Sequence, residues 1–566
     1  MNIKNSGVNF LRLSINKLNG SFFSIISFLL LSALVILSLD HYVDGNIVIY
    51  PLHAYELVTN GTLSFQIYTE DVTNVFYPNF HAFLYTLYLS LVFKIFNIFH
   101  ELDPYSINIA IKFANLSLIL LTGYIFSLFF YNKDEKNRHL ILAYTLLPSS
   151  ILGYLCVVED QVLTPIFLLL TFYLIEKNRN IFWIILAGTF SILSKETTGT
   201  IGLIFILFGE VFFLNRVSVF KAIKIFFTSS LLALILYLWL CYIFNLDPLF
   251  IIYTTSGHLA GGGFRLENIV IQSRYLLQAF TPFLIVFLPL FFNKKIFENR
   301  KLLFTAFIFL SINAINVITG YINIRYLSAF IPLMLVLIVQ SSVDKSFYNI
   351  KTLLVAILLA ITFIAVVDDP YILLSNLSEK SFNELIYILS MIILFCFASI
   401  TINRINQFKN FYFLVIVSPL IYLNLSIKDY QIGYSHGLQQ IKPIIELIDE
   451  NKYIFTDLPT PEFYFRNQVI YTTDPISHFF SKTSWGGDGK SLSIDLESSN
   501  KIHDVLTNDR QNFITAKASN LSEFYVWTLN NTDTRSFFES NYFCNTMNKS
   551  NERSVDHILL ECSNPD

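Results

Sequence analysis

Long apolar runs recur along the first 423 residues of the chain, and most have about the length of a membrane-spanning helix. A helix needs about 20 mainly apolar residues to cross the hydrocarbon core of a bilayer. Charged residues make up only 14% of the sequence, whereas soluble globular proteins carry about 25%. The runs therefore predict a polytopic helical membrane protein. A soluble enzyme, a disordered chain and a secreted disulfide scaffold are excluded.

Net charge excludes one further class of protein. The chain has 38 Lys and Arg residues against 41 Asp and Glu residues. It therefore has no basic excess with which to meet the phosphates of a nucleic acid. The sequence also contains no GxGxxG segment and no P-loop, so no nucleotide site is expected.

We expect about 13 transmembrane helices in an all-α membrane domain, residues 1–425. The predicted spans are Ser21–Leu39, Ile107–Phe130, Leu140–Val157, Gln161–Ile175, Ile181–Leu193, Gly199–Leu214, Ile225–Phe244, Tyr275–Phe292, Leu302–Ile318, Tyr326–Val339, Leu353–Val367, Leu385–Ile400 and Phe411–Leu423. One further apolar run, residues 79–99, carries several polar side chains, and we interpret it as a helix lying in the membrane interface.

The basic residues predict which side of the membrane each loop faces. Half of them, 19 of the 38, fall in short interruptions such as Lys133 to Arg138 and Lys294 to Lys301. Basic loops stay in the cytoplasm. The basic segment before the first span therefore places the N-terminus in the cytoplasm, and an odd number of spans places the C-terminus on the opposite side. The long first loop, residues 40–106, and the C-terminal domain are extracytoplasmic.

The last part of the chain, residues 426–566, is polar and predicts a soluble α/β domain. We expect a helix over 439–450 and short strands over Tyr453–Asp457, Val469–Tyr471, Phe513–Ala516, Phe524–Leu529 and His557–Cys562. Cys544 and Cys562 are the two cysteines of this domain. In an oxidising compartment they are expected to pair.

Polar and ionisable residues close to the membrane are costly and point to function. On the predicted outer side lie Asp40, Asp44, His53, Glu56, Glu70, Asp71, Glu159, Asp160, Lys195, Glu196, His258, Arg265 and Arg325. A carboxylate can take a proton from an acceptor, and cations can stabilise a phosphate leaving group. Singly, each has a plainer explanation: Asp40 can mark the end of a span, Lys195 and Glu196 can neutralise each other, and Arg325-Tyr326 can be an interfacial anchor.

The order of these residues along the chain carries a resemblance. It runs from Asp44 through His53-Ala54-Tyr55-Glu56-Leu57 and Phe76-Tyr77-Pro78-Asn79 to Val158-Glu159-Asp160, then to Lys195, His258, Arg265 and Arg325-Tyr326. In this order the chain resembles the C-fold class of membrane glycosyltransferases, which use polyprenyl-phosphate sugars. That class includes protein O-mannosyltransferases, which use dolichyl phosphate sugars, and the lipid A aminoarabinose transferase. Two departures are visible: Gly45 follows Asp44 where many relatives have Glu, and Phe76 and Tyr77 stand where the aminoarabinose enzyme has an acidic metal ligand.

The resemblance implies a role for each matched residue. Asp44 is the expected general base, with Asp40 as the second choice. Lys195, Arg265, Arg325 and Tyr77 are expected to bind the donor phosphate, and Asp160 and Glu159 to orient charged groups. His258 is the expected ligand of a divalent ion such as Mg²⁺, Mn²⁺ or Zn²⁺. The implied partners are a polyprenyl-phosphate-linked sugar and an acceptor protein, lipid or glycan at the outer face of the cell membrane.

Three other functions stay open on the sequence. A transporter or flippase of lipid-linked sugars needs polar residues at mid-membrane depth. Most charged residues lie at span ends instead, and Lys112, near the outer start of its span, is the main exception. A ligase that polymerises lipid-linked glycans is the nearest enzymatic alternative. A membrane anchor for an outer domain leaves the polar loops unexplained.

Overall fold

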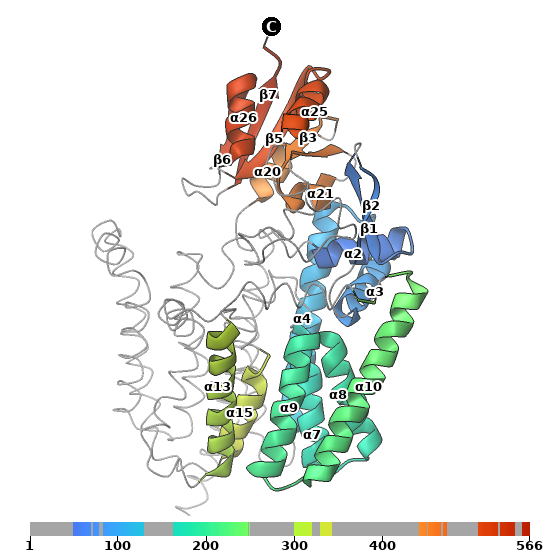
Figure 1. Ribbon diagram of the computed structural model, residues 1–566, viewed down its shortest axis with the longest axis vertical. Helices are drawn as coiled ribbons and strands as arrows, with labels where there is room; N and C mark the ends of the chain where they lie inside the picture. The colour runs from blue at the N-terminus through green and yellow to red at the C-terminus, as the bar shows by residue number, and fades with distance from the viewer. Residues whose placement is uncertain are drawn as a thin grey trace, which may run out of the picture.

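The structure is a computed structural model of the chain, and it describes residues 49–69, 72–78, 83–129, 162–246, 248–249, 299–319, 329–341, 441–449, 451–465, 468–472, 508–529, 532–549 and 557–565. A bundle of long helices forms one end of the molecule and a small α/β domain forms the other (Figure 1). We call the end of the bundle nearer the α/β domain its domain side, and the opposite end its far side. The predicted spans before residue 49, and those within 131–161, 251–298 and 342–440, lie outside the described residues.

Seven described helices lie where the sequence predicts spans. They are α4 (Pro104–Leu128), α7 (Thr164–Glu176), α8 (Ile181–Ser194), α9 (Glu196–Phe212), α10 (Val219–Ile243), α13 (Arg300–Thr319) and α15 (Ile331–Gln340). Of the described helices, two contain stretches long and apolar enough to cross a membrane, Tyr105–Phe126 and Val219–Ile243. Helix α9 begins three residues before the predicted start at Gly199, because Lys195 and Glu196 do not form a loop.

Asparagines end three of these helices. Asn178, Asn215 and Asn245 have φ angles of 48°, 53° and 51°, in the left-handed region that asparagine tolerates better than most residues. After α7, the Asn178 N–H donates to the Ile175 carbonyl and the Arg179 N–H to the Leu174 carbonyl, both at 2.9 Å. These bonds satisfy carbonyls that the helix leaves open and turn the chain back toward α8.

Helix α10 presents a wide apolar face outward. Phe220, Phe227, Trp239 and Tyr242 on this helix have 79%, 65%, 57% and 86% of their surface exposed. An apolar face of this extent is unfavourable in water and favourable against lipid. The helix therefore has the surface expected of a span at the edge of a membrane bundle.

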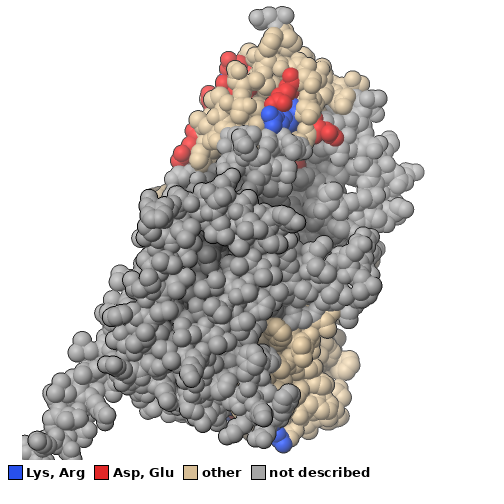
Figure 2. Space-filling view, turned by 90° about the vertical axis from the view of Figure 1, so that its left-hand side faces the viewer, with Lys and Arg blue, Asp and Glu red and all other residues tan. Residues whose placement is uncertain are grey.

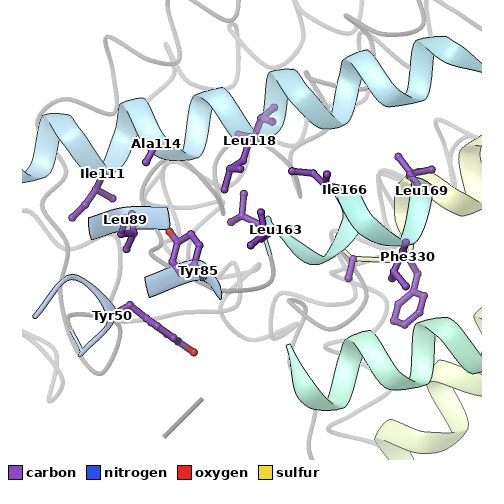
Figure 3. Packing of buried hydrophobic residues seen from close by; sticks show 14 of the residues in the cluster. Tyr50, Tyr85, Leu89, Ile111, Ala114, Leu118, Leu163, Ile166, Leu169 and Phe330 are labelled. Carbon is purple, nitrogen blue, oxygen red and sulfur yellow. The ribbon is translucent and has the colours of Figure 1, made fainter. Parts of the chain in front are cut away.

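The segment between residues 49 and 99 covers the domain side of the bundle. It contains α2 (Ile49–Thr59), a hairpin of β1 (Ser64–Thr69) and β2 (Val72–Pro78), and α3 (Leu84–Phe99). The sequence did not predict the hairpin, and it placed the start of α3 five residues too early. Figure 3 shows Tyr85 and Leu89 of α3 beside Ile111 and Ala114 of α4, in one continuous apolar cluster.

The C-terminal domain is a five-stranded sheet in the order β4-β3-β5-β7-β6. Its strands are β3 (Ile454–Thr456), β4 (Val469–Tyr471), β5 (Glu523–Leu529), β6 (Phe543–Lys549) and β7 (His557–Ser563). Strand β3 runs parallel to both β4 and β5, whereas β7 is antiparallel to β5 and β6. On the face seen in Figure 2, acidic side chains of this domain surround a small group of basic atoms. Lys452 of β3's flanking turn is ion-paired in this domain, because its Nζ lies 2.6 Å from Glu523 and 2.8 Å from Glu561.

The two faces of this sheet pack against different partners. Phe524 and Val526 of β5 point into a cluster with Phe538, on the face covered by α25 (Asn508–Ala518) and α26 (Asp533–Asn541). Tyr525 and Trp527, which alternate with them, belong instead to the apolar cluster that extends into the helical bundle. Because successive side chains of β5 point to opposite faces of the sheet, this one strand packs against both the domain core and the helical bundle. Two short helices, α20 (Lys442–Leu447) and α21 (Pro459–Phe465), lie near this junction.

One predicted strand is wrong. Residues Phe513–Ala516 lie within helix α25, not in a strand. The fully buried apolar residues here are Ile514 and Ala518, which are four positions apart and share one face of a helix. The strand prediction rested on the run Phe513-Ile514-Thr515, which is too short to separate a period of two from a period of 3.6. The predicted helix over 439–450 is shorter in the structure, and β6 was not predicted.

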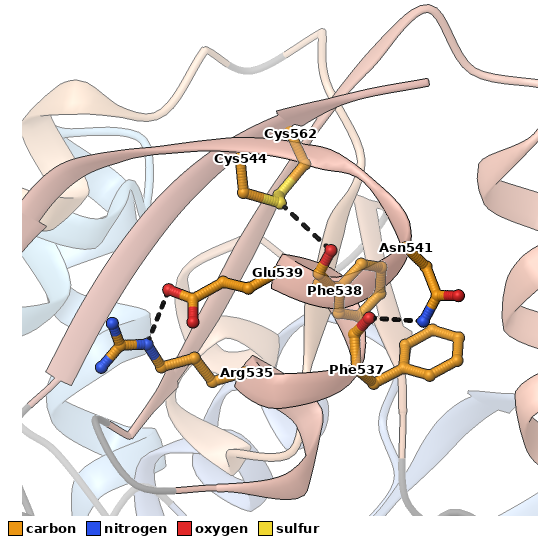
Figure 4. Close-up of a disulfide and its surroundings, with 7 residues drawn as sticks. All are labelled: Arg535, Phe537, Phe538, Glu539, Asn541, Cys544 and Cys562. Atoms are coloured by element: carbon orange, nitrogen blue, oxygen red, sulfur yellow. Dashed lines mark hydrogen bonds and ion pairs between the residues drawn. A yellow bond between two sulfur atoms is a disulfide. The ribbon is translucent and has the colours of Figure 1, made fainter. Parts of the chain in front are cut away.

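The predicted disulfide is confirmed. Cys544 of β6 and Cys562 of β7 face each other across the ladder and are bonded (Figure 4). Cys562 is buried at 1% exposure, and the Phe538 carbonyl of α26 lies 3.6 Å from the Cys544 sulfur. The bond therefore ties the edge strand to the core of the domain.

We expect removal of this disulfide to destabilise the domain by about 3 kcal/mol. The two cysteines are 18 residues apart, and closing a loop of this size reduces the entropy of the unfolded chain by that amount. Unfolding of a Cys544→Ala/Cys562→Ala double variant, followed by hydrogen exchange in β6 and β7, measures the loss. Cys241→Ala, at a buried cysteine of α10 that takes no part in this disulfide, is the control. Two thiols that react with a label in the native, unreduced protein contradict the pairing.

Candidate functional site

Three helix ends meet on the domain side of the bundle. Helix α7 begins there at Thr164, and α8 ends there at Ser194. The Ser194 hydroxyl lies 3.0 Å from Thr164 Oγ1 and 2.7 Å from the Ser191 carbonyl oxygen. The side chains of Thr164, Ser191 and Ser194 are all buried. The bonds fix the start of α7 against the end of α8 and so fix the position of the next residue, Lys195.

Lys195 is the single residue between α8 and α9. Its backbone is extended, with φ −158° and ψ 113°, so the chain reverses direction at this point. The reversal brings Gly199 against the end of α8, where a Cβ atom would lie 1.8 Å from the Ser191 carbonyl oxygen. Only glycine fits so close an approach. Lys195 itself is 5% exposed, which leaves a cation largely out of water at the tip of a helical hairpin.

A buried polar stripe runs along α4. Asn108, Lys112, Asn115 and Thr122 are spaced as neighbours on one helical face, and each is at most 3% exposed. The Tyr85 hydroxyl of α3 donates to Asn115 Oδ1 at 2.8 Å. At the domain end, Asn108 Nδ2 donates to the Tyr464 hydroxyl of α21 at 3.2 Å. The stripe therefore continues from the bundle into the C-terminal domain.

Helix α2 adds two more buried ionisable side chains on the domain side. His53 and Glu56 are 0% and 8% exposed, and they lie three residues apart on one helical face. Asn60 Nδ2 donates to Glu56 Oε2 at 2.5 Å. These two residues and Lys112 were predicted from the sequence, whereas Asn108, Asn115 and the contact of Tyr85 with Asn115 were not. The i, i+4, i+7 spacing of Asn108, Lys112 and Asn115 was the available signal.

Of the residues predicted to form the site, two lie in described segments. Lys195 occupies the hairpin tip. Tyr77 lies in β2, in register with Phe65 of β1. The predicted residues Asp40, Asp44, Glu159, Asp160, His258, Arg265 and Arg325 lie outside the described residues, and their roles stay predictions. Within the described ranges, no group of three His, Cys, Asp or Glu side chains could hold a metal ion.

Four charged side chains on the far side of the bundle, with Gln340, form one network. Arg216 donates to both carboxylate oxygens of Glu210, at 2.8 Å and 2.5 Å, and lies 3.3 Å from Glu176. Gln340 of α15 donates to Glu176, and Lys301 of α13 donates to Gln340. This network joins four helices, α7, α9, α13 and α15, through Arg216 in the loop after α9. It is structural, because its charges are already matched and it lies opposite Lys195.

A second buried carboxyl lies at the junction between domain and bundle. Asp457 follows β3 directly, and the Thr528 hydroxyl of β5 donates to it at 2.7 Å. Asp457 lies at the end of β3, where the strand order of the sheet changes direction, because β4 pairs with one edge of β3 and β5 with the other. Burial raises the pKa of Asp457, and the bond from Thr528 offsets part of that increase.

We expect an Asp457→Asn variant to stabilise the C-terminal domain at neutral pH. The pKa of Asp457 is higher in the folded chain than its ordinary 3.8, so the folded state binds the proton more tightly. Stability is therefore full below about pH 4 and falls as pH rises through the raised pKa. Hydrogen exchange of β3 and β5 measures this in both proteins. The variant's advantage should vanish near pH 4; an advantage independent of pH contradicts the explanation.

Comparisons with known proteins identify the fold. No model of a protein family matches the sequence, and no protein of curated function matches it. Two solved structures match over nearly the whole chain: ArnT from Cupriavidus metallidurans in the apo state, and the same protein bound to undecaprenyl phosphate. Each covers 96% of this chain and 98% of its own, with TM-score 0.57 and 12% and 11% identity. The chain therefore shares the fold of a membrane protein of that architecture.

Proposed function

We propose that this protein is a membrane glycosyltransferase that moves a sugar from a polyprenyl-phosphate donor to an acceptor at the outer face of the membrane. The observation that carries the proposal is the shared fold with ArnT, the lipid A aminoarabinose transferase, one of whose structures holds undecaprenyl phosphate. The buried cation Lys195 supports it, because it lies where α7, α8 and α9 meet.

In the proposed reaction, an acceptor hydroxyl attacks the anomeric carbon of the donor sugar. The new bond joins that carbon to the acceptor oxygen, and the bond from carbon to phosphate oxygen breaks. Asp44, or Asp40 in its place, takes the acceptor's proton. Polyprenyl phosphate leaves with the bonding electron pair. Atoms and charge balance without any further reactant.

Lys195, Arg265 and Arg325 would neutralise the charge that develops on the leaving phosphate, and Tyr77 would donate to it. Asp160 and Glu159 would orient these cations. A fixed charge in a water-poor site stabilises a developing anion more strongly than one in water does, and Lys195 has that burial. A divalent ion at His258 would supply Lewis-acid assistance, and it too stays a prediction.

The test is sugar transfer by purified protein in lipid nanodiscs, from a synthetic polyprenyl-phosphate sugar to an extract of cell-envelope acceptors, followed by mass spectrometry. Lys195→Met keeps the length of the side chain and removes its charge. We expect turnover to fall about 100-fold, with Lys195→Arg falling less. Lys224→Met, at the start of α10 on the far side, is the control. Full activity in Lys195→Met would remove this residue from the site.

One observation favours a second function. The buried stripe on α4 places Lys112 and Thr122 within the predicted span, as a transporter or flippase of lipid-linked sugars requires. The same nanodisc assay separates the two functions. A transporter leaves the sugar on its polyprenyl phosphate, whereas a transferase releases free polyprenyl phosphate.

A further inference from the structure

One hydroxyl in the bundle is buried without a hydrogen bond. Thr198 is 3% exposed, and among the described residues its Oγ1 has no partner. Other buried threonines of the bundle donate to the carbonyl four residues earlier, as Thr171 does to Phe167 at 2.7 Å and Thr122 to Leu118 at 2.8 Å. A buried hydroxyl that lacks such a bond is destabilising and rare in native proteins.

The break at Lys195 explains why Thr198 cannot follow the others. Four residues before Thr198 lies Ser194, which belongs to α8 and not to α9. The extended backbone of Lys195 separates the two helices, so the Ser194 carbonyl is not aligned with α9. The first bond of α9 runs from the Gly199 N–H to the Lys195 carbonyl, at 2.7 Å. The hydroxyl is therefore left for a partner from outside the helix.

The same turn supplies other groups that attract an anion. The N–H groups of residues 196–198 precede the first bond of α9, and such groups make the start of a helix an anion-binding position. Helix α9 has 17 residues, long enough for its dipole to contribute. Lys195 is the N-cap residue of α9, and Thr198 is the third residue of that helix, so both belong to its first turn. A hydroxyl, backbone amides and an ammonium group are the set that phosphate oxygens accept from.

One group in the turn opposes an anion. Glu196 is half-buried, and within α9 it lies two residues before Thr198, about 200° away around the helix. Glu196 and Thr198 therefore lie on opposite faces of α9. Removal of the charge of Glu196 should therefore leave anion binding at the face of Thr198 unchanged or make it tighter.

We propose that Thr198 Oγ1, the first N–H groups of α9 and Lys195 form a seat for a phosphate monoester. The assignment of that monoester to a polyprenyl phosphate rests on the proposed function. In this assignment the Thr198 hydroxyl donates to a phosphate oxygen when the lipid is bound, and it stays unpartnered when the lipid is absent. Thr198 is thus a donor-binding residue. Its unpaired hydroxyl destabilises the ligand-free fold and forms its hydrogen bond only when the lipid is bound.

The test uses the full chain in phosphatidylcholine nanodiscs and measures the binding of undecaprenyl phosphate by native mass spectrometry. Thr198→Val keeps the shape of the side chain and removes the hydroxyl. We expect binding to weaken about 10-fold, as for loss of one hydrogen bond to a charged group. The ligand-free melting temperature should stay equal or rise, because an unsatisfied hydroxyl has been removed.

Two control variants make the result specific. Thr171→Val removes a hydroxyl that is bonded within α7, so it should lower the melting temperature and leave binding unchanged. Glu196→Gln should bind as well as the wild type or better. Wild-type binding by Thr198→Val would overturn the proposal. So would a lower ligand-free melting temperature in that variant, because it would show that the hydroxyl is bonded within the fold.

Competition identifies the source of the phosphate group. Phosphatidic acid is a phosphate monoester with acyl chains in place of the polyprenyl chain, and inorganic phosphate is the free dianion. Failure of both to displace undecaprenyl phosphate supports the assignment, and displacement by either at equal concentration overturns it. If the wild-type protein binds undecaprenyl phosphate through Thr198 but transfers no sugar, the phosphate seat is supported and the proposed function is contradicted. If sugar transfer is normal and binding does not depend on Thr198, the phosphate seat is contradicted and the proposed function is supported.

Discussion

An Asp44→Asn variant should insert and bind donor lipid normally yet lose nearly all sugar transfer. The substitution keeps the size of the side chain and removes the charge that accepts a proton from the acceptor hydroxyl. General-base assistance contributes about 10²–10⁴-fold in rate, so a loss of that size is expected. In the sequence Asp44 follows the first predicted span by five residues, and Gly45 beside it leaves room for an acceptor.

The matched control for this prediction is Asp40→Asn. Asp40 follows directly on the predicted end of the span, so its loss should have the milder effect. Turnover and undecaprenyl phosphate binding are measured on each purified variant. Near-normal turnover in Asp44→Asn with an inactive Asp40→Asn would assign the base to Asp40. Full activity in both would remove the first loop from the chemistry and favour transport.

An Arg216→Met variant should be destabilised by about 3–5 kcal/mol, the usual effect of leaving one member of a buried ion pair alone. Glu210 is 0% exposed and receives two bonds from Arg216. The guanidinium also lies over the Phe172 ring, 5.1 Å from its centre. Without Arg216 the Glu210 carboxylate would be buried without its main counter-charge. Thermal unfolding in nanodiscs, followed by size-exclusion chromatography, measures the change.

The double variant Glu210→Gln/Arg216→Met separates lost pairing from lost packing. It removes both charges and keeps both side-chain volumes, so most of the stability should return. A single variant as stable as the wild type would show that the pair contributes nothing. A double variant as unstable as the single one would assign the effect to packing around Phe172.

Apolar run length predicted the positions of the described spans well, because a helix in lipid must satisfy its own backbone. It failed where polar residues interrupt the pattern. Lys195 and Glu196 indicated a loop, yet a single residue makes the turn, since Gly199 permits the two helices to approach. The hairpin over 64–78 was missed because its pairing is set by contacts that a hydropathy window does not contain.

The candidate site was less predictable than the fold. Lys195 was found from its order in the chain, but its burial depends on Thr164 and Ser194, which carry no signal in a sequence. Thr198 was missed for a related reason. A threonine in an apolar helix usually bonds its own backbone, and only the break in the chain before it shows that this one does not.

The apolar cluster that joins Tyr525 and Trp527 to the bundle has a consequence for how the protein loses its structure. When two parts of a chain share one core, neither can melt without exposing the other, so their unfolding is coupled. Asn108 and Tyr464 strengthen that coupling with a buried bond across the junction. Deletion of the C-terminal domain is therefore not equivalent to removal of an appendage. It would expose the domain-side end of α4 and leave Asn108 without its bond to Tyr464.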